Sequence, residues 1–426
     1  MLDINFIKEN KDLVAENAKN KNREVKLDEL LKLADREKTL RQEIDELNRL
    51  RNEASKERNV ERGKELKDRA EKVTKEHAEI KKIFLSLMLQ VPNIYSPDTP
   101  IGPDESANKV IRAWGEVRKF DFTPKEHDEL GEALGVIDQK TAAEVAGARF
   151  VYLKGGLALM QYALLNHCIS ILSNKETLEE IAKNARLSLK VEPFIQVVPP
   201  VFVKPAVQNR AARFLTPEEH YMFPADDLML VGSAEHTLAP MYMDKIVDEG
   251  DLPKRFSAFT PAFRREAGSY GKDTKGIIRQ HQFDKLEMEV FSLPENSLQE
   301  QDFLVAIQEH LLRSLKIPYQ VVAVSTGDMG FPDYRQIDIE AWMPGQAKYR
   351  ETHTSDLTTS FQSRRLSARV KRTNGNIEPL HMNDATLCAM GRMLAVIMEN
   401  YQREDGRIEI PEVLLPYMNG VTELRS

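Results

Sequence analysis

The side chains best suited to chemistry lie between residues 254 and 291. Every second side chain of an extended segment faces the same way, so one face of the segment after residue 281 is apolar. The other face carries an aromatic ring, an amine and carboxylates: Phe283, Lys285, Glu287 and Glu289. The loop before it is basic: Arg264, Arg265, Lys272, Lys275, Arg279 and His281. Such a surface suits a polyanion together with a small polar ligand, although alternation by itself favours a solvated outer face.

A β-strand with one exposed face would position these side chains together. The segment reads as two extended runs joined by a long loop, in which Gly268, Gly271 and Gly276 permit backbone turns that other residues disfavour. The sequence therefore predicts a hairpin that buries Leu286 and Met288 in the core.

The composition predicts a soluble, folded protein with no overall preference for nucleic acid. The chain has 426 residues, of which 41% are hydrophobic and 30% charged, enough for one large domain and a smaller one. Its formal net charge is -7. An RNA contact would therefore have to be local, where Lys and Arg side chains gather.

The two cysteines, Cys168 and Cys388, lack metal-ligand spacing and lie in apolar runs. We expect buried thiols in a reducing compartment and no zinc site. The first residues lack the features of a signal or transit peptide, and no apolar run approaches the length of a membrane span. A cytoplasmic protein with no membrane partner is expected.

Residues 27–91 place hydrophobic side chains at alternating spacings of three and four, which is typical of an antiparallel helical coiled coil. A short helix within residues 1–26 precedes it. Charge alone favours a solvated surface at the tip over an RNA contact. A rigid arm that reaches a distant part of a long substrate would nevertheless explain why an enzyme carries a coiled coil. The basic residues around the tip include Arg49, Lys56, Arg58, Arg62 and Lys64.

Two further segments carry local signals. Residues 91–110 are rich in Pro, Gly, Asp and Ser and mark a linker into a second domain, in which Pro124 is predicted at the first position of a helix. Pro199 and Pro200 interrupt a β-branched run. Because proline cannot donate to a sheet ladder, this run belongs at a sheet edge or a subunit boundary.

Residues 263–289, FRREAGSYGKDTKGIIRQHQFDKLEME, closely resemble motif 2 of class II aminoacyl-tRNA synthetases, in the version found in the seryl-tRNA synthetase family. Other segments of that family occur in the expected order: SAEHTL at 233–238, TGDMG at 326–330, YRETHTSDLTTSFQSRR at 349–365 and MGRMLAVIMENYQREDGRIEIPEVLLPYMNG at 390–420. The resemblance covers nearly the whole chain. It implies an α+β fold, with an N-terminal antiparallel α-helical coiled-coil arm (1–105) and a class II catalytic domain (106–426) built on an antiparallel β-sheet flanked by helices.

The resemblance implies a serine–tRNA ligase. L-Serine and ATP form seryl-adenylate, and the serine then passes to tRNA(Ser), and to tRNA(Sec) where that tRNA exists. Both steps need positioning and charge neutralisation more than a base, because a carboxylate is already a nucleophile and pyrophosphate a good leaving group. The family is a homodimer whose arm grips tRNA, and Pro200 matches the end of the motif 1 strand at the dimer interface.

The ATP-binding positions of the family match residues on both sides of the hairpin. Arg264 takes the place that bridges the α-phosphate and the substrate carboxylate, a bidentate task that suits a guanidinium. Arg265 and Glu266 fall in the same stretch, with Glu266 near the adenine amino group. Phe283 matches the ring that stacks on adenine, and Arg392 matches the arginine that holds the γ-phosphate.

A magnesium site and its neighbours are implied in the same way. Glu351 matches the principal ligand and Thr354 a second oxygen donor, both suited to a hard cation. Thr352 and His353 belong to the same ATP-binding run but depart from the family pattern. We expect His353 to be a loop histidine and not a ligand or a base.

Serine can be distinguished from alanine only where polar groups would be stranded without its hydroxyl. The resemblance assigns this hydroxyl to Glu287 and Thr386. It also assigns Ser233, Ala234 and Glu235 to a loop whose first and third residues meet the substrate ammonium.

Catalysis is predicted to depend on Arg264, Arg392 and Glu287. Two alternatives stay open: a synthetase-like ligase that loads an amino acid onto a carrier protein, and a coiled-coil interaction protein with a dead catalytic domain. The basic arm speaks against the first, and the coexistence of these three residues with Glu351 speaks against the second. Residues 204–224 lack the glycine-rich loop common in the family, which leaves open what closes over the site from that side.

Overall fold

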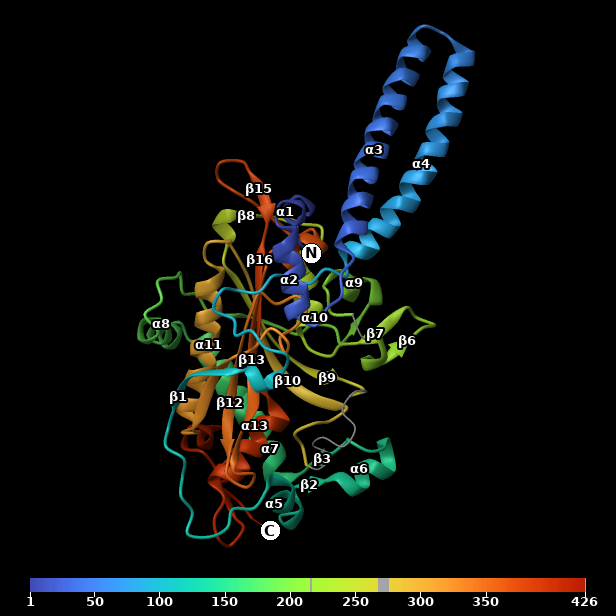
Figure 1. Cartoon of the computed structure of the whole chain (residues 1–426). Coiled ribbons are helices and arrows are strands. Elements are labelled where there is room, and N and C mark those ends of the chain that lie inside the picture. The colour runs from blue at the N-terminus through green and yellow to red at the C-terminus, as the bar shows by residue number, and fades with distance from the viewer. Residues whose placement is uncertain (215–216, 267–275, 426) are drawn as a thin grey trace. The chain divides into compact units, whose positions relative to one another are not determined.

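Two compact units make up the chain, residues 1–95 and 96–426. The computed structural model describes residues 1–214, 217–266 and 276–425 (Figure 1). Four residues of the predicted loop, Gly268, Gly271, Lys272 and Lys275, lie outside the described residues.

The first unit is helical, with α1 (Ile4–Glu9), α2 (Lys11–Asn20), α3 (Leu27–Lys56) and α4 (Val60–Met88). The long helices α3 and α4 run antiparallel as predicted (Figure 1). Leu40, Leu47 and Ala54, which carry the predicted seam of α3, are buried. The turn ends at Asn59, whose side chain accepts a hydrogen bond of 3.1 Å from the backbone N–H of Arg62 and so caps α4. The coiled-coil prediction is confirmed.

The second unit is built on an eight-stranded sheet in the order β1-β11-β12-β13-β16-β10-β9-β4. Neighbouring strands are antiparallel, except that β4 runs parallel to β9. The strands are β1 (Lys109–Trp114), β4 (Ile195–Val197), β9 (Lys254–Phe263), β10 (Gln282–Ser292), β11 (Tyr319–Ala323), β12 (Arg335–Met343), β13 (Lys348–Thr359) and β16 (His381–Ala389).

Helices α7 (Gly155–Ser173), α11 (Ser297–Ser314) and α13 (Met390–Tyr401) pack against one face of this sheet (Figure 1). Together with Leu286 and Met288 of β10 they form the main hydrophobic core. By length and hydropathy α7 could cross a membrane, contrary to the expectation that no run approaches that length. Its apolar side chains are explained by packing, because Leu157, Met160 and Leu164 are fully buried in this core.

The hairpin of β9 and β10 is confirmed, with Phe283 paired to Ala262 and Glu287 to Ala258. Its polar face is not solvated, however. Helix α10 (Glu235–Leu238) covers it, and a second core forms on this side from residues that include Leu238 and Phe291. Glu287 and its neighbours are buried, so the expectation from alternation alone was wrong at this strand.

Shorter elements complete the second unit. The helices are α5 (His127–Ala133), α6 (Gln139–Ala146), α8 (Lys175–Asn184), α9 (Pro205–Arg210) and α12 (Phe361–Leu366). The strands are β2 (Ile137–Asp138), β3 (Tyr152–Leu153), β5 (Phe202–Val203), β6 (Met222–Phe223), β7 (Leu228–Leu230), β8 (Ile246–Asp248), β14 (Arg369–Lys371), β15 (Ile377–Pro379), β17 (Ile408–Glu409) and β18 (Glu423–Leu424). The 3-10 turns are η1 (Glu105–Ala107), η2 (Pro217–Glu219), η3 (Ala239–Tyr242), η4 (Glu249–Asp251) and η5 (Glu412–Tyr417).

Of three local predictions for the second unit, two are confirmed and one is wrong. Pro199 and Pro200 come one residue after the end of β4, the edge strand of the large sheet, as expected. Cys168 and Cys388 are free and buried, also as expected. The helix predicted from Pro124 instead begins at His127.

Candidate active site

The polar face of the sheet opens into a cavity of about 160 Å³ beside the hairpin. Side chains reach it from β10, β13, β16, α13 and the loop after β9. A larger hollow of about 680 Å³ adjoins it and shares Arg279, Glu351 and Arg392. The lining of the smaller cavity includes Arg264, Glu266, Phe283, Lys285, Glu351, Thr352, Thr354, Thr386 and Arg392. The structure therefore brings together most of the predicted ATP-binding residues.

Arg264 and Phe283 form one wall of the cavity. The backbone N–H of Arg264 donates to the carbonyl oxygen of His281 at 3.0 Å, which extends the hairpin ladder by one step beyond β9. Its Nε donates to the carbonyl oxygen of Gly232 at 3.1 Å, and its guanidinium lies 5.4 Å from the centre of the Phe283 ring. The ring and the guanidinium thus face the same space.

Arg392 and Glu351 also line the cavity. Arg392 lies in the first turn of α13, and its Nη1 donates to Oε1 of Glu351 at 2.7 Å and to the backbone carbonyl oxygen of the same residue at 3.0 Å. Burial would raise the pKa of Glu351, but the guanidinium of Arg392 holds it below its usual value. Glu351 is therefore a carboxylate at neutral pH.

The run after Glu351 on β13 divides between the two faces of the sheet. Thr354 lines the cavity, and its hydroxyl lies 3.4 Å from Oδ1 of Asp356. His353 is buried in the strand, where its Nδ1 shares a hydrogen bond of 2.7 Å with the hydroxyl of Thr352. Burial lowers its pKa to about 3. The expectation of a loop histidine was wrong, and His353 does not line the cavity.

The two residues after Arg264 point in different directions. Glu266 lines the cavity, and its Oε2 lies 3.2 Å from Nη1 of Arg279. Arg265 instead places its guanidinium 5.7 Å from the centre of the Tyr221 ring and is absent from the lining of the cavity.

Glu287 lies deeper, behind Lys285 and Thr386. Its Oε2 is 2.5 Å from Nζ of Lys285, 3.3 Å from Oγ of Ser233 and 3.4 Å from Oγ1 of Thr386. Thr386 is its direct cross-strand partner on β16. Burial raises the pKa of Glu287, although Lys285 opposes that shift. A carboxyl group with two hydroxyls and an amine around it can recognise a small polar ligand.

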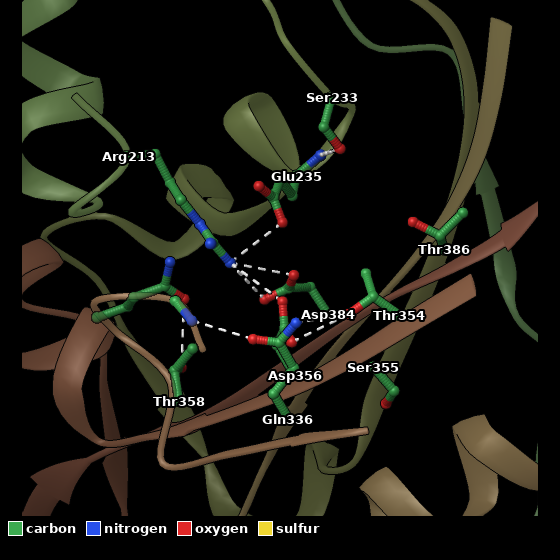
Figure 2. A network of polar contacts seen from close by, with 12 residues as sticks. Arg213, Ser233, Glu235, Gln336, Thr354, Ser355, Asp356, Thr358, Asp384 and Thr386 are labelled. Atoms are coloured by element: carbon green, nitrogen blue, oxygen red, sulfur yellow. Dashed lines mark hydrogen bonds and ion pairs between the residues drawn. The ribbon is translucent and has the colours of Figure 1, made fainter. Parts of the chain in front are cut away.

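Glu235 stands at the first position of α10, close to Asp384 (Figure 2). Ala234 before it is fully buried in the second core, which holds the start of the helix in place. Oxygens of Glu235, Glu287 and Asp384 all lie within 4.8 Å of one another. Three carboxyl groups this close favour a cation between them, and an organic ammonium is one such cation.

Sequence reasoning missed three side chains at this site. Lys285 was seen on the polar face but received no role, although its alternation with Phe283 and Glu287 pointed to the cavity. Asp384 lies opposite Glu289 in the register of β10 and β16, which only the strand pairing reveals. Arg213, which contacts Glu235 at 3.2 Å, carried no signal in the sequence.

Comparison with known proteins agrees with this geometry. Residues 1–95 match the family model described as seryl-tRNA synthetase N-terminal domain, and residues 221–401 match the tRNA synthetase class II core domain (G, H, P, S and T). A serine–tRNA ligase of Pseudothermotoga lettingae is 36% identical, covering 98% of this chain and 99% of the relative. One from Rubrobacter xylanophilus is 36% identical, covering 98% of both. The chain belongs to the seryl-tRNA synthetase family.

Solved structures of the seryl-tRNA synthetase family extend the likeness to the fold. The crystal structure of seryl-tRNA synthetase from Pyrococcus horikoshii complexed with ATP is 34% identical with a TM-score of 0.88, covering 100% of this chain and 99% of that one. A cytoplasmic serine–tRNA ligase from Naegleria fowleri in complex with AMP is 27% identical with a TM-score of 0.86, covering 100% of this chain and 99% of that one. The α+β class II fold is confirmed, and the chain is an ATP-dependent aminoacyl-tRNA ligase specific for serine.

Proposed function

We propose that this serine–tRNA ligase binds ATP and L-serine side by side on the polar face of β10, forms seryl-adenylate there and transfers the serine to tRNA(Ser). One observation carries the proposal. Phe283, Lys285 and Glu287 share a face, and Arg264 and Arg392 both line the cavity beside them. The arrangement supports a nucleotide site and an amino-acid site in direct contact.

In the ATP site, Phe283 stacks on the adenine, and Glu266 accepts from its amino group. Arg264 bridges the α-phosphate and the serine carboxylate, so that the carboxylate oxygen approaches phosphorus in line with the departing pyrophosphate. Arg392 holds the γ-phosphate. Because the negative charge moves from the serine carboxylate onto pyrophosphate, fixed guanidinium groups at both ends of the triphosphate lower the barrier. Arg265 and Thr352 support the site from its margin.

Glu351 and Thr354 would hold a magnesium ion. Both line the cavity, and a carboxylate with a hydroxyl is a donor set that suits a hard cation. Magnesium would neutralise part of the triphosphate charge when bound. Glu351 must exchange its ion pair with Arg392 for that contact, which also frees Arg392 to meet the γ-phosphate.

In the amino-acid site, Glu235 and Ser233 receive the substrate ammonium. The serine hydroxyl donates to Glu287 and lies beside Thr386. Lys285, 3.2 Å from Thr386 and 2.5 Å from Glu287, balances the charge of the acid that reads the hydroxyl. Alanine would occupy the site without donating a hydrogen bond to Glu287, and this lost hydrogen bond is the physical basis for selecting serine.

The helical arm is proposed to bind tRNA(Ser), and tRNA(Sec) where that tRNA exists, through Arg49, Lys56, Arg58, Arg62 and Lys64. The chain is proposed to act as a homodimer in the cytoplasm, with a catalytic domain that begins near residue 106, ten residues into the second compact unit. Exposed apolar side chains next to Pro199 and Pro200 support the dimer: Ile195 is 50% exposed and Val198 98%.

The test is a pair of assays on the whole chain. Serine-dependent exchange of pyrophosphate into ATP reports adenylate formation, and serine transfer to tRNA(Ser) reports the second step. We expect both activities with serine and much lower activities with alanine at the same concentration. Exchange without transfer to any tRNA would instead support the carrier-protein alternative, and the absence of exchange would support the dead-enzyme alternative.

A further inference from the structure

Arg213 lies at the centre of a buried acidic cluster on the polar face of the sheet (Figure 2). Its Nη2 is 3.2 Å from Oε2 of Glu235, 3.0 Å from Oδ1 of Asp384 and 4.0 Å from Oδ2 of Asp356. The side chain of Arg213 is 16% exposed, and those of the three acids 12% or less. One guanidinium thus contacts carboxyl groups from α10, β16 and β13.

The charges in this cluster are unequal, and Arg213 decides how they are distributed. Burial raises the pKa of Asp384 well above the ordinary value, which favours its neutral form. At Glu235 burial acts in the same direction, but the guanidinium of Arg213, together with Asp384, Lys285 and His236, outweighs it, and the pKa falls below the ordinary value. Of these neighbours Arg213 has the largest effect. The pKa of Glu235 is therefore shifted in the opposite direction to that of Asp384, which favours a negative charge on Glu235.

Arg213 is delivered to this place by a firmly held segment. Its backbone N–H donates to the carbonyl oxygen of Gln208 at 3.1 Å. The Gln208 side chain donates to the carbonyl oxygen of His236, next to Glu235, at 2.6 Å. Gln362 holds the carbonyl oxygen of Ala211 at 3.0 Å. This segment follows α9 and is the one for which the sequence suggested no role.

We propose that Arg213 is a positioning residue for the amino-acid site: it holds the Glu235 carboxylate at the point where that carboxylate meets the substrate ammonium. The inference rests on the proposed role of Glu235. Arg213 does not touch the substrate, because its Nη2 is directed at Glu235, Asp384 and Asp356. Arg213 determines how much binding free energy the substrate ammonium contributes, and it does not affect ATP binding.

The test compares L-serine with L-glycerate, in which a hydroxyl replaces the amino group. Dissociation constants for both are measured by calorimetry in the presence of a non-hydrolysable ATP analogue. In Arg213→Met we expect the constant for L-serine to rise by about thirtyfold or more, as the loss of one partner of a buried ion pair implies. The constant for L-glycerate should change by less than about threefold, because its hydroxyl depends little on a negative Glu235.

Arg213→Lys keeps the charge but not the fork of donors, so L-serine affinity should recover in part. If Arg213→Met does not fold, the dissociation constants of Arg213→Lys test the proposal instead. Arg365→Met is the matched control, because Arg365 is a buried arginine that holds the same segment through the carbonyl oxygens of Asn209 and Arg210, at 2.6 and 3.0 Å. We expect Arg365→Met to leave the ratio of the two constants unchanged.

The outcomes separate this inference from the proposed function. If the unmodified enzyme binds L-glycerate as tightly as L-serine, the role of Glu235 is wrong. If it prefers L-serine and Arg213→Met weakens both ligands by the same factor, Arg213 is only structural and the positioning role is overturned. A rise in KM for ATP equal to that for serine in pyrophosphate exchange would overturn it as well.

Discussion

Glu287 is 1% exposed and lies among an amine and two hydroxyls on the polar face of β10. On a solvated strand the same residue would be interchangeable with other polar side chains. Here the removal of Glu287 would leave Lys285 and Thr386 buried without their carboxylate partner, which costs free energy. The hydroxyl of a bound serine would lower that cost by hydrogen bonding to them. Glu287 is therefore the residue on which the selection of serine most depends.

Replacing Glu287 with alanine should narrow the preference for serine over alanine by about tenfold or more, because the hydroxyl loses its buried acceptor. The ratio of kcat/KM for the two amino acids in pyrophosphate exchange measures it. Glu309→Ala is the matched control, since Glu309 is a buried carboxylate that pairs with Arg112 elsewhere in the unit. If the Glu287 variant discriminates between serine and alanine as well as the normal chain does, Glu287 has no part in selecting serine.

Arg392→Ala should slow adenylate formation by a factor of about a hundred or more, because a fixed charge at the γ-phosphate is lost. Single-turnover formation of seryl-adenylate is the measurement. Arg313→Ala, which removes an arginine paired with Glu309, should leave the rate within about twofold. If Arg392→Ala forms adenylate at the normal rate, the residue has no part in holding the triphosphate.

His353 links pH to the stability of the fold. Its pKa is lowered to about 3 by burial, whereas an unfolded histidine titrates near about 6.5. Such a group contributes its full stability above the unfolded value and loses it as the pH falls toward the folded value. The free energy of unfolding should therefore drop by about 1.4 kcal/mol per pH unit on its account between about pH 6 and 4.

Urea unfolding of the normal chain and of His353→Leu at several pH values isolates this contribution. Burial likewise lowers the pKa of His236 to about 3 and of His381 to about 4, so both chains keep some dependence on pH. The difference between the two chains belongs to His353. Parallel curves would show that this histidine titrates normally in the folded protein.

At the scale of elements, the hairpin and the helical arm follow from local periodicity, and the start of α5 does not. The backbone N–H of His127 donates to Oε1 of Glu399 at 3.2 Å, and that of Lys125 to Oε1 of Gln402 at 2.8 Å. These side chains belong to α13 or directly follow it, about 270 residues away along the chain. They hold the preceding backbone extended, so the helix begins three residues after Pro124.

The tip of the arm yields a prediction about tRNA. Within the described chain no ion pair joins Lys56, Arg58 or Lys64 to an acid, whereas Arg49 is paired with Glu46 and Glu53 at 2.6 and 2.5 Å. Free cations neutralise phosphates more effectively than paired ones. The triple alanine variant of the three free cations should raise KM for tRNA(Ser) by about tenfold or more and leave pyrophosphate exchange unchanged.

Arg49→Ala is the matched control for that experiment and should have a smaller effect on the same KM. The triple variant should also show a shallower dependence of tRNA affinity on salt, since fewer counterions are released on binding. A normal KM together with a normal salt dependence would remove the arm tip from the tRNA interface.

At the scale of the whole molecule, β4 leaves apolar side chains beside the end of the sheet. Val198 is 98% exposed, and an aspartate there would have to be buried in a dimer interface. Val198→Asp should therefore weaken the dimer by at least about tenfold, which light scattering after size-exclusion chromatography measures. Val145→Asp, at a valine of α6 that is 69% exposed, should leave the mass unchanged. A monomeric normal chain would contradict the homodimer.

The sequence by itself determined which residues share a face. A period of two placed Phe283 and Glu287 together on β10, and a three-four spacing set the seam of the arm, because both patterns depend only on backbone geometry within a few residues. The motif residues Arg264, Arg392 and Glu351 could likewise be named before their positions were known. The structure brings all three to one cavity.

Only the tertiary structure decided what surrounds those faces. Helix α10 covers β10 and buries Glu287. Arg213 belongs to a segment about 70 residues before Glu287 in the sequence. His353 is enclosed in the sheet and does not lie in a loop. The physical reason is that burial and charge balance depend on partners distant in sequence. Local periodicity carries no information about which distant side chain supplies the compensating charge.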